Sequence, residues 1–259
     1  MAKRKTGTRE WAETSFNIGT GCAHDCRYCY ARSMSKRAGT IKSDSEWTTE
    51  TLKTKMPATT KKKGWVMFPT THDITPFYLP MALLTVSELL ANGNKVLIVS
   101  KPHLECVAAM CRTFEPFKDN VLFRFTIGTS DEDTAKFLEP GAPSIEERLA
   151  CLTFAFNHGF ATSVSMEPML GTVEEARDLF LAMEINVTDK IWIGKMNKID
   201  QRVVKVSPEV IAKCEAVLEN QSNAKIMWLV NQLFDHPKIA WKDSIKEIIE
   251  AHENNRLDL

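Results

Sequence analysis

The sequence predicts an α/β fold: an open, partial (β/α)6 barrel of the TIM-like kind with a C-terminal helical extension. Six short apolar runs recur along the chain, and amphipathic, helix-like stretches lie between them. Continuous apolar runs are typical of strands that are buried on both faces of a parallel sheet. A strand followed by a helix, repeated, indicates right-handed parallel crossovers. Six such units, rather than eight, would leave the barrel open on one side.

The expected strands and helices alternate along the chain. The strands are Ser15–Gly19, Trp65–Pro69, Lys95–Ser100, Val121–Ile127, Ala161–Met166 and Lys190–Ile193. The helices cover residues 79–91, 103–114, 144–157, 172–184 and 208–218. Ser144 and Thr172 are expected N-caps, because a glutamate follows each of them three residues later, as in a capping box. Ser207 is a third expected N-cap, with a proline at the first helical turn.

Two segments depart from this alternation. Residues 42–63 are polar and rich in Thr and Lys, and we expect a helix plus a loop that crosses to the second strand. Residues 1–200 are predicted to form the barrel, and residues 201–259 an extension packed on it, because about 60 residues alone make a marginal core. Within the extension, Ile226–Val230 could form a seventh strand, and a charged helix is expected near Trp241–His252.

Composition excludes several classes of protein. Lys plus Arg and Asp plus Glu both number 33, so no global field attracts nucleic acid or a membrane surface. The basic runs at residues 3–5 and 61–63 are expected to be solvated. No apolar run approaches the ~18 residues of a membrane helix, and no secretory signal is recognisable. We therefore expect a cytoplasmic protein with no membrane partner.

The cysteines indicate a metal site. Seven is an odd number, and three of the cysteines lie within eight positions, at Cys22, Cys26 and Cys29. Clustered cysteines of odd number argue for metal ligation in a reducing compartment rather than for disulfides. Three thiolates at this spacing can bind one [4Fe-4S] cubane and leave the fourth iron open. His24 could complete a zinc site instead, but inside the short loop it would have to reach the same metal under strain.

This motif resembles the signature of the radical SAM enzymes, with Tyr28 in the aromatic position before the last cysteine. Further segments resemble the spore photoproduct lyase-like branch of that family: Phe68–Asp73, Val96–Lys101, Leu138–Pro140, Ala142–Ser144 and Arg148–Leu149. The resemblance covers about residues 15–197. It breaks at residues 69–73, where spore photoproduct lyase carries a hydrogen-donor cysteine and this chain has none. That departure counts against thymine-dimer repair by the same route.

The resemblance implies a cofactor pair and a reaction type. The open iron of the cluster would chelate S-adenosylmethionine, and an electron from a reductant such as flavodoxin or ferredoxin would cleave it. The products would be methionine and a 5′-deoxyadenosyl radical that abstracts a substrate hydrogen. The substrate, which could be a nucleic acid base or nucleoside, and the catalytic hydrogen donor stay open. The alternative is a non-catalytic iron–sulfur or zinc binding module.

The resemblance also suggests cofactor-binding residues near the first strands. Tyr28 would hold the adenine side, mainly through its backbone. Thr71 and Asp73 could accept a hydrogen bond from the amino group of the cofactor, or cap the following helix. Lys101 would pair with the methionine carboxylate. Thr126 would contact the ribose or the carboxylate, unless it forms part of the barrel wall.

Later strand ends supply the remaining candidates. Arg148 could clamp the cofactor carboxylate or form an ion pair with Glu139. Glu167 could bind the ribose hydroxyls or a substrate amine, or pair with Lys195 or Lys101. Lys195 and Asn197 are better placed for substrate than for cofactor. The other four cysteines are expected to be buried apolar residues rather than ligands of a second cluster: Cys106, Cys111, Cys151 and Cys214.

Overall fold

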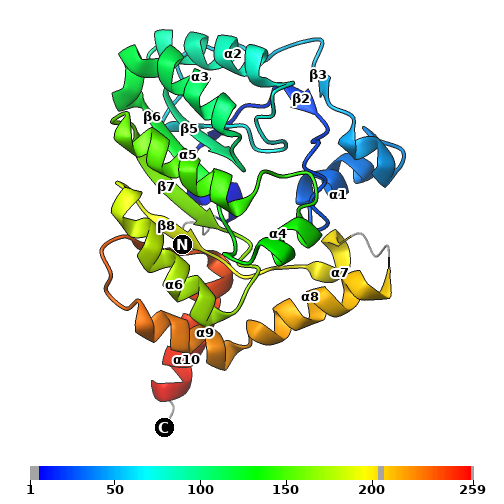
Figure 1. Ribbon diagram of the computed structural model, residues 1–259, viewed down its shortest axis with the longest axis vertical. Helices are drawn as coiled ribbons and strands as arrows, with labels where there is room; N and C mark the ends of the chain where they lie inside the picture. The colour runs from blue at the N-terminus through cyan, green and yellow to red at the C-terminus, as the bar shows by residue number, and fades with distance from the viewer. Residues whose placement is uncertain (1–5, 204–206, 258–259) are drawn as a thin grey trace.

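The main sheet is parallel and follows the order of the sequence. The computed structural model describes residues 6–203 and 207–257, so the basic run at residues 3–5 lies outside it. Every pair of neighbouring strands in the main sheet is parallel, and β1 and β9 form its two edges (Figure 1). The predicted open α/β fold is therefore confirmed. The strands are β1 (Thr14–Ser15), β4 (Trp65–Phe68), β5 (Lys95–Ser100), β6 (Val121–Thr126), β7 (Ala161–Met166), β8 (Ile191–Ile193) and β9 (Ile239–Trp241).

Each of the strands β4 to β7 is followed by a long helix that covers the outer face of the sheet, and after β6 the short α4 (Glu132–Leu138) comes first (Figure 1). Ser144 Oγ accepts a hydrogen bond from Glu147 N at 3.1 Å, and Thr172 Oγ1 accepts one from Glu175 N at 3.2 Å. Both predicted N-caps are confirmed, but the carboxylates of the two glutamates accept hydrogen bonds from other loops. The helices are α2 (Leu79–Ala91), α3 (Leu104–Phe114), α5 (Ile145–Asn157) and α6 (Val173–Met183).

The first strand is shorter than predicted. β1 ends at Ser15, and Gly19–Thr20 forms β2, which pairs antiparallel with β3 (Thr51–Leu52) in a separate ribbon. Tyr78 holds β2 away from the main sheet. Its hydroxyl donates a hydrogen bond to the Thr20 carbonyl at 2.8 Å, and its ring lies so close to Gly19 that a Cβ there would overlap it. The helix expected within residues 42–63 is also wrong. That stretch holds the short 3₁₀ helix η2 (Asp44–Thr48) and β3, and the first helix is α1 (Tyr30–Arg37), directly after the cysteine motif.

The C-terminal part contributes a strand, but not the one predicted. Ile226–Val230 lies inside α9 (Asn223–Gln232), and the seventh strand of the sheet is β9. A short apolar run does not distinguish a strand from a buried helix. α9 packs against α6. The other helices of this part are α8 (Pro208–Asn220), which begins after the predicted N-cap Ser207, and α10 (Asp243–Leu257).

The N-terminal segment lies inside the open barrel. Trp11 packs edge-to-face on Trp192 of β8, with ring centroids 6.0 Å apart, and the guanidinium of the buried Arg124 lies over both rings. Arg124 also donates to Ser163 Oγ at 2.9 Å and pairs with Asp189 at 3.1 Å. Among the described residues, no helix is long and apolar enough to cross a bilayer.

Candidate functional site

A cavity of about 640 Å³ opens at the C-terminal edge of the main sheet, and all three cysteines of the motif line it. Parallel strands bring their C-terminal ends together, so side chains that are distant in sequence meet there. Of the residues proposed from the sequence, those that line it are Tyr28, Thr71, Asp73, Lys101, Thr126, Glu167, Lys195 and Asn197. Arg148 does not line this cavity.

The cysteine loop is fixed by backbone contacts on both sides. Gly21 adopts a φ of +91°, and a Cβ there would overlap the carbonyl oxygen of Thr49, so only glycine fits. Cys22 N donates to Trp47 O at 2.8 Å. On the other side, Gly141 N donates to His24 O at 3.0 Å. These contacts hold the loop through its backbone.

The thiols suit a metal cluster. Cys22 and Cys26 are each 5% exposed, and Cys29 is partly exposed. Burial raises the pKa of Cys22, Cys26 and Cys29 above its ordinary value. Without a cation the three groups would stay protonated, and metal binding is the usual way in which buried thiols become thiolates. Three sulfur donors in the wall of one cavity fit a [4Fe-4S] cluster with an open iron.

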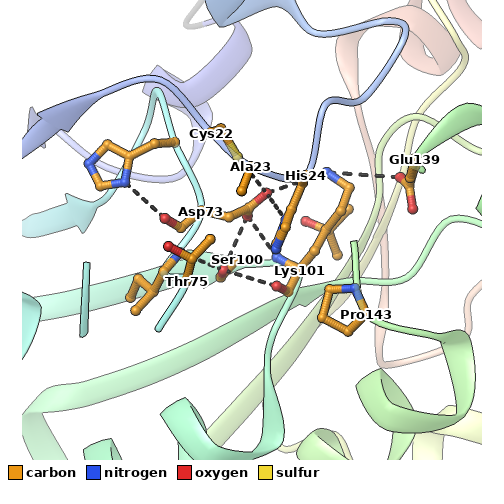
Figure 2. A network of polar contacts seen from close by, with 12 residues as sticks. Cys22, Ala23, His24, Asp73, Thr75, Ser100, Lys101, Glu139 and Pro143 are labelled. Carbon is orange, nitrogen blue, oxygen red and sulfur yellow. Dashed lines mark hydrogen bonds and ion pairs between the residues drawn. The ribbon is translucent and has the colours of Figure 1, made fainter. Parts of the chain in front are cut away.

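Asp73 is the centre of a polar network (Figure 2). Its Oδ2 lies 2.8 Å from His24 Nδ1, and its Oδ1 accepts hydrogen bonds from Lys101 N at 2.8 Å and Ser100 Oγ at 3.1 Å. Burial alone would raise the pKa of Asp73, but Lys101 and His24 outweigh it and hold that pKa well below its usual range. The N-cap of α2 is Tyr78, so the helix-capping alternative for Asp73 is wrong.

Lys101 follows β5 and points into the same cavity. Its Nζ lies 3.9 Å from Asp73 Oδ2 and 3.9 Å from Glu139 Oε1, and its side chain is 11% exposed. Burial would lower the pKa of Lys101, but Cys26, Tyr28 and the two carboxylates raise it well above its usual value. The ammonium therefore stays charged beside the cysteine loop.

Arg148 forms the ion pair that was its alternative role. Its Nη1 lies 2.6 Å from Glu139 Oε2, and both side chains are 1% exposed. Arg148 Nε also donates to Pro143 O at 2.9 Å. Glu139 in turn accepts a hydrogen bond from the hydroxyl of Tyr28. Arg148 therefore lies behind the site and acts on it through Glu139, which corrects the expectation of a carboxylate clamp.

Glu167 has a partner that the sequence does not suggest. Lys242 Nζ, at the end of β9, lies 3.3 Å from Glu167 Oε2 and 3.4 Å from Glu10 Oε2. It also donates to the Gly7 carbonyl at 2.8 Å. The alternative given for Glu167, a pair with Lys195 or Lys101, is therefore wrong, because its partner is Lys242. The extension and the N-terminal segment thus meet at the mouth of the barrel.

Other cavity residues carry no recognisable signal in the sequence. Arg202, the last residue of α7 (Ile199–Arg202), and Arg9, in η1 (Gly7–Glu10), both line the cavity from segments outside the strand ends. The sequence suggests only a zinc-ligand role for His24, yet its Nε2 lies 2.9 Å from His103 Nε2. These contacts depend on the tertiary fold. The four remaining cysteines are free and almost fully buried, as predicted: Cys106, Cys111, Cys151 and Cys214.

Comparison with known proteins places the chain in a family. The sequence model of the radical SAM superfamily matches residues 16–183 of this chain. These residues include the cysteine motif, Asp73 and Lys101. A curated relative, the uncharacterized protein ORF301 of Acidianus two-tailed virus, is 27% identical over 198 residues. That match covers 71% of this chain and 64% of the viral protein, so the chain spans less than two thirds of that relative.

Solved structures share the fold. Spore photoproduct lyase complexed with dinucleoside spore photoproduct is similar with a TM-score of 0.57 at 14% identity, over 89% of this chain and 77% of that one. SuiB of Streptococcus suis bound to S-adenosylmethionine is similar with a TM-score of 0.52 at 11% identity, over 88% of this chain and 51% of that one. The resemblance to the spore photoproduct lyase-like branch is thus confirmed in the fold.

Members of the matched family are enzymes that use a [4Fe-4S] cluster and S-adenosylmethionine and take an electron from an external donor. The matched segment covers well over half of the sequence, and the donor set of the cavity fits these cofactors. This chain belongs to the radical SAM superfamily.

Proposed function

We propose that Cys22, Cys26 and Cys29 hold a [4Fe-4S] cluster and that the protein cleaves S-adenosylmethionine to act on a substrate in the same cavity. The observation that carries the proposal is that the three thiols and Lys101 lie in the wall of one cavity. When bound, the cluster supplies the electron that splits S-adenosylmethionine into methionine and a 5′-deoxyadenosyl radical, which takes a hydrogen atom from the substrate. A flavodoxin or ferredoxin is the proposed source of that electron.

The residues around the cysteine loop would bind and orient S-adenosylmethionine. Lys101 holds the carboxylate, because its ammonium is charged, largely buried and held only at long distance by Asp73 and Glu139. Thr71 and Asp73 accept from the amino group, and Asp73 also keeps Lys101 in place through its backbone N–H.

The adenosine part would lie further along the cavity. Tyr28 supports the adenine, with its hydroxyl fixed on Glu139 and Glu139 fixed in turn by Arg148. Thr126, which is 9% exposed, and Glu167 contact the ribose from the ends of β6 and β7. Lys195 and Asn197 remain for the substrate.

A second candidate function rests on a different set of ligands. One sulfur, one imidazole nitrogen and one carboxylate oxygen, from Cys22, His24 and Asp73, lie within 4.8 Å of one another and could hold a zinc ion. In that case the protein would be a non-catalytic binding module. However, both nitrogens of His24 already face other side chains, Asp73 and His103. The cluster therefore fits the site better.

The two functions are separated by metal content and by product. After anaerobic reconstitution, addition of dithionite and S-adenosylmethionine should yield 5′-deoxyadenosine. Cys26→Ala and Cys29→Ala should each lose the iron–sulfur absorbance, whereas a zinc site on Cys22, His24 and Asp73 would survive both changes. The matched control is the fourfold variant in which Cys106, Cys111, Cys151 and Cys214 become Ala, and it should keep about four irons per chain. If this control held only half the iron of the wild-type protein, a second cluster would be present in the wild type.

For the substrate, we propose only a broad chemical class. A nucleic acid base or nucleoside is supported by the fold of spore photoproduct lyase, which was crystallised with a dinucleoside photoproduct. The strand end at residues 69–73 offers no cysteine as hydrogen donor, so repair by that route is not proposed. Transfer of deuterium from a deuterated nucleoside into 5′-deoxyadenosine would identify the substrate, and absence of transfer across nucleosides and oligonucleotides would exclude this class.

A further inference from the structure

Three residues that line the cavity and come from different segments carry positive charge. Lys195 follows β8, Arg202 ends α7 and Arg9 lies in η1, and all three line the same cavity as the cysteines. Among the residues that the structure describes, no hydrogen bond or ion pair engages the charged groups of these three side chains. Each is therefore available to a ligand.

The carboxylates of the cavity are already engaged. Asp73 is held by His24, Ser100 and Lys101 near the cysteine loop. Glu167 is held by Lys242 at 3.3 Å, and Lys242 is itself only 2% exposed. The field of Arg202 reaches Glu167, but their charged atoms are not in contact. Among the lining residues, the charge that lacks a close partner is therefore positive.

Such a surplus has a physical cost that a ligand can remove. Burial lowers the pKa of Lys195, which means that its ammonium is poorly solvated and gains little from neighbouring charge. A cation in a partly dry site is disfavoured unless an anion pairs with it. A phosphate monoester carries a charge of about −1.5 to −2 at pH 7 and offers three acceptor oxygens, which matches several cations better than a single carboxylate does.

We infer that Lys195, Arg202 and Arg9 bind a phosphate group of the substrate, so that the enzyme acts on a phosphate-bearing molecule. The inference rests on the proposed function, because it assigns the substrate to the same cavity. Asn197, which also lines the cavity, adds a neutral side-chain amide beside the cations. Lys101 is not part of this set, because the proposed function assigns it to the cofactor carboxylate.

The test measures binding of inorganic phosphate to the whole chain by isothermal titration calorimetry at constant ionic strength in chloride. Lys195→Gln and Arg202→Gln each remove one charge-assisted hydrogen bond, so the dissociation constant of phosphate should rise roughly tenfold to a hundredfold in each. Neither change strips a described carboxylate of a partner, and circular dichroism checks that both variants are folded. Lys198→Gln is the matched control: Lys198 lies on the same segment, is exposed and does not line the cavity, so affinity should change less than twofold.

Three results would overturn the inference: no saturable phosphate binding, equal phosphate affinity in all three variants, or acetate binding as tightly as phosphate with the same dependence on Lys195 and Arg202. The last result would assign a carboxylate-bearing substrate instead. Binding is read without any turnover. A wild-type protein that forms 5′-deoxyadenosine but does not bind phosphate refutes this inference alone, and one that binds phosphate but forms no 5′-deoxyadenosine refutes only the proposed function.

Discussion

Lys101→Met is the sharpest test of how the cofactor is held. The change keeps the aliphatic stem and removes the ammonium, which lies 3.9 Å from both Asp73 Oδ2 and Glu139 Oε1. These distances exceed the 2.7–3.2 Å of a good N–H···O bond, so the three donors of the ammonium are not saturated. A cofactor carboxylate would accept a charge-assisted hydrogen bond worth about 1.5–3 kcal/mol. Affinity for S-adenosylmethionine should therefore fall roughly tenfold to a hundredfold.

The fold should survive this change, because both carboxylates keep other partners. Asp73 retains His24 at 2.8 Å, and Glu139 retains Arg148 at 2.6 Å. The assay is equilibrium binding of S-adenosylmethionine to anaerobically reconstituted protein, with iron content measured on the same samples. Lys95→Met makes the same substitution at the start of the same strand, on the opposite edge of the sheet, and should leave affinity unchanged. An unchanged dissociation constant in Lys101→Met, with iron intact, would refute the reasoning and leave Lys101 with a purely structural role between its two carboxylates.

Three further changes test the surroundings of the site. In Gly141→Ala, the new Cβ would overlap the carbonyl oxygen of Ala23, so the cysteine loop should shift and iron content after reconstitution should fall; full iron content would contradict the close packing. Lys242→Met leaves the buried carboxylate of Glu10 and the partly exposed one of Glu167 without their main cation, and it should cost about 3 kcal/mol of unfolding free energy in urea. Lys246→Met, at a more exposed lysine, should cost about 1 kcal/mol or less, and equal losses would be inconsistent with a buried pair of Lys242 and Glu10. Burial lowers the pKa of His72 below 6.5, so the unfolded chain takes up this proton first as the pH falls, and stability present above pH 6.5 is lost below it. The slope of unfolding free energy between about pH 7.5 and 5.5 should be smaller in His72→Asn, and an identical slope would assign the pH dependence to other groups.

The strands are predictable where the pattern has clear borders. β5 runs from Lys95 to Ser100 as expected, because an Asn-Gly turn precedes it and Pro102 follows closely. The predicted first strand is too long, because Gly19 is turned out of the sheet by its contact with Tyr78. Tyr78 lies far along the chain, so the local sequence does not show where the strand ends. The strand predicted at Ile226–Val230 is wrong since five apolar residues suit a buried strand or one face of a helix equally well.

The functional site is also predictable only in part. The ends of parallel strands carry the working residues of such folds, which predicts that Asp73, Lys101 and Glu167 share one cavity, and all three line it. Their partners could not be predicted, because each pairing depends on how distant segments pack. Lys242 reaches Glu167 only because β9 closes the edge of the sheet, and nothing local to Lys242 marks it as part of the site.

The contact between Lys242 and Gly7 also sets an order of events during synthesis. Its two residues lie 235 positions apart, so the wall that it closes exists only after Lys242 has left the ribosome. At about 5–20 residues per second, Cys22 is made roughly 10–45 s before Lys242. During that interval the wall closed by Lys242 is missing, so the thiols are open to water and oxidants. Delivery of the metal cluster is therefore best timed after Lys242 has been made, when Lys242 and the N-terminal segment have closed this wall.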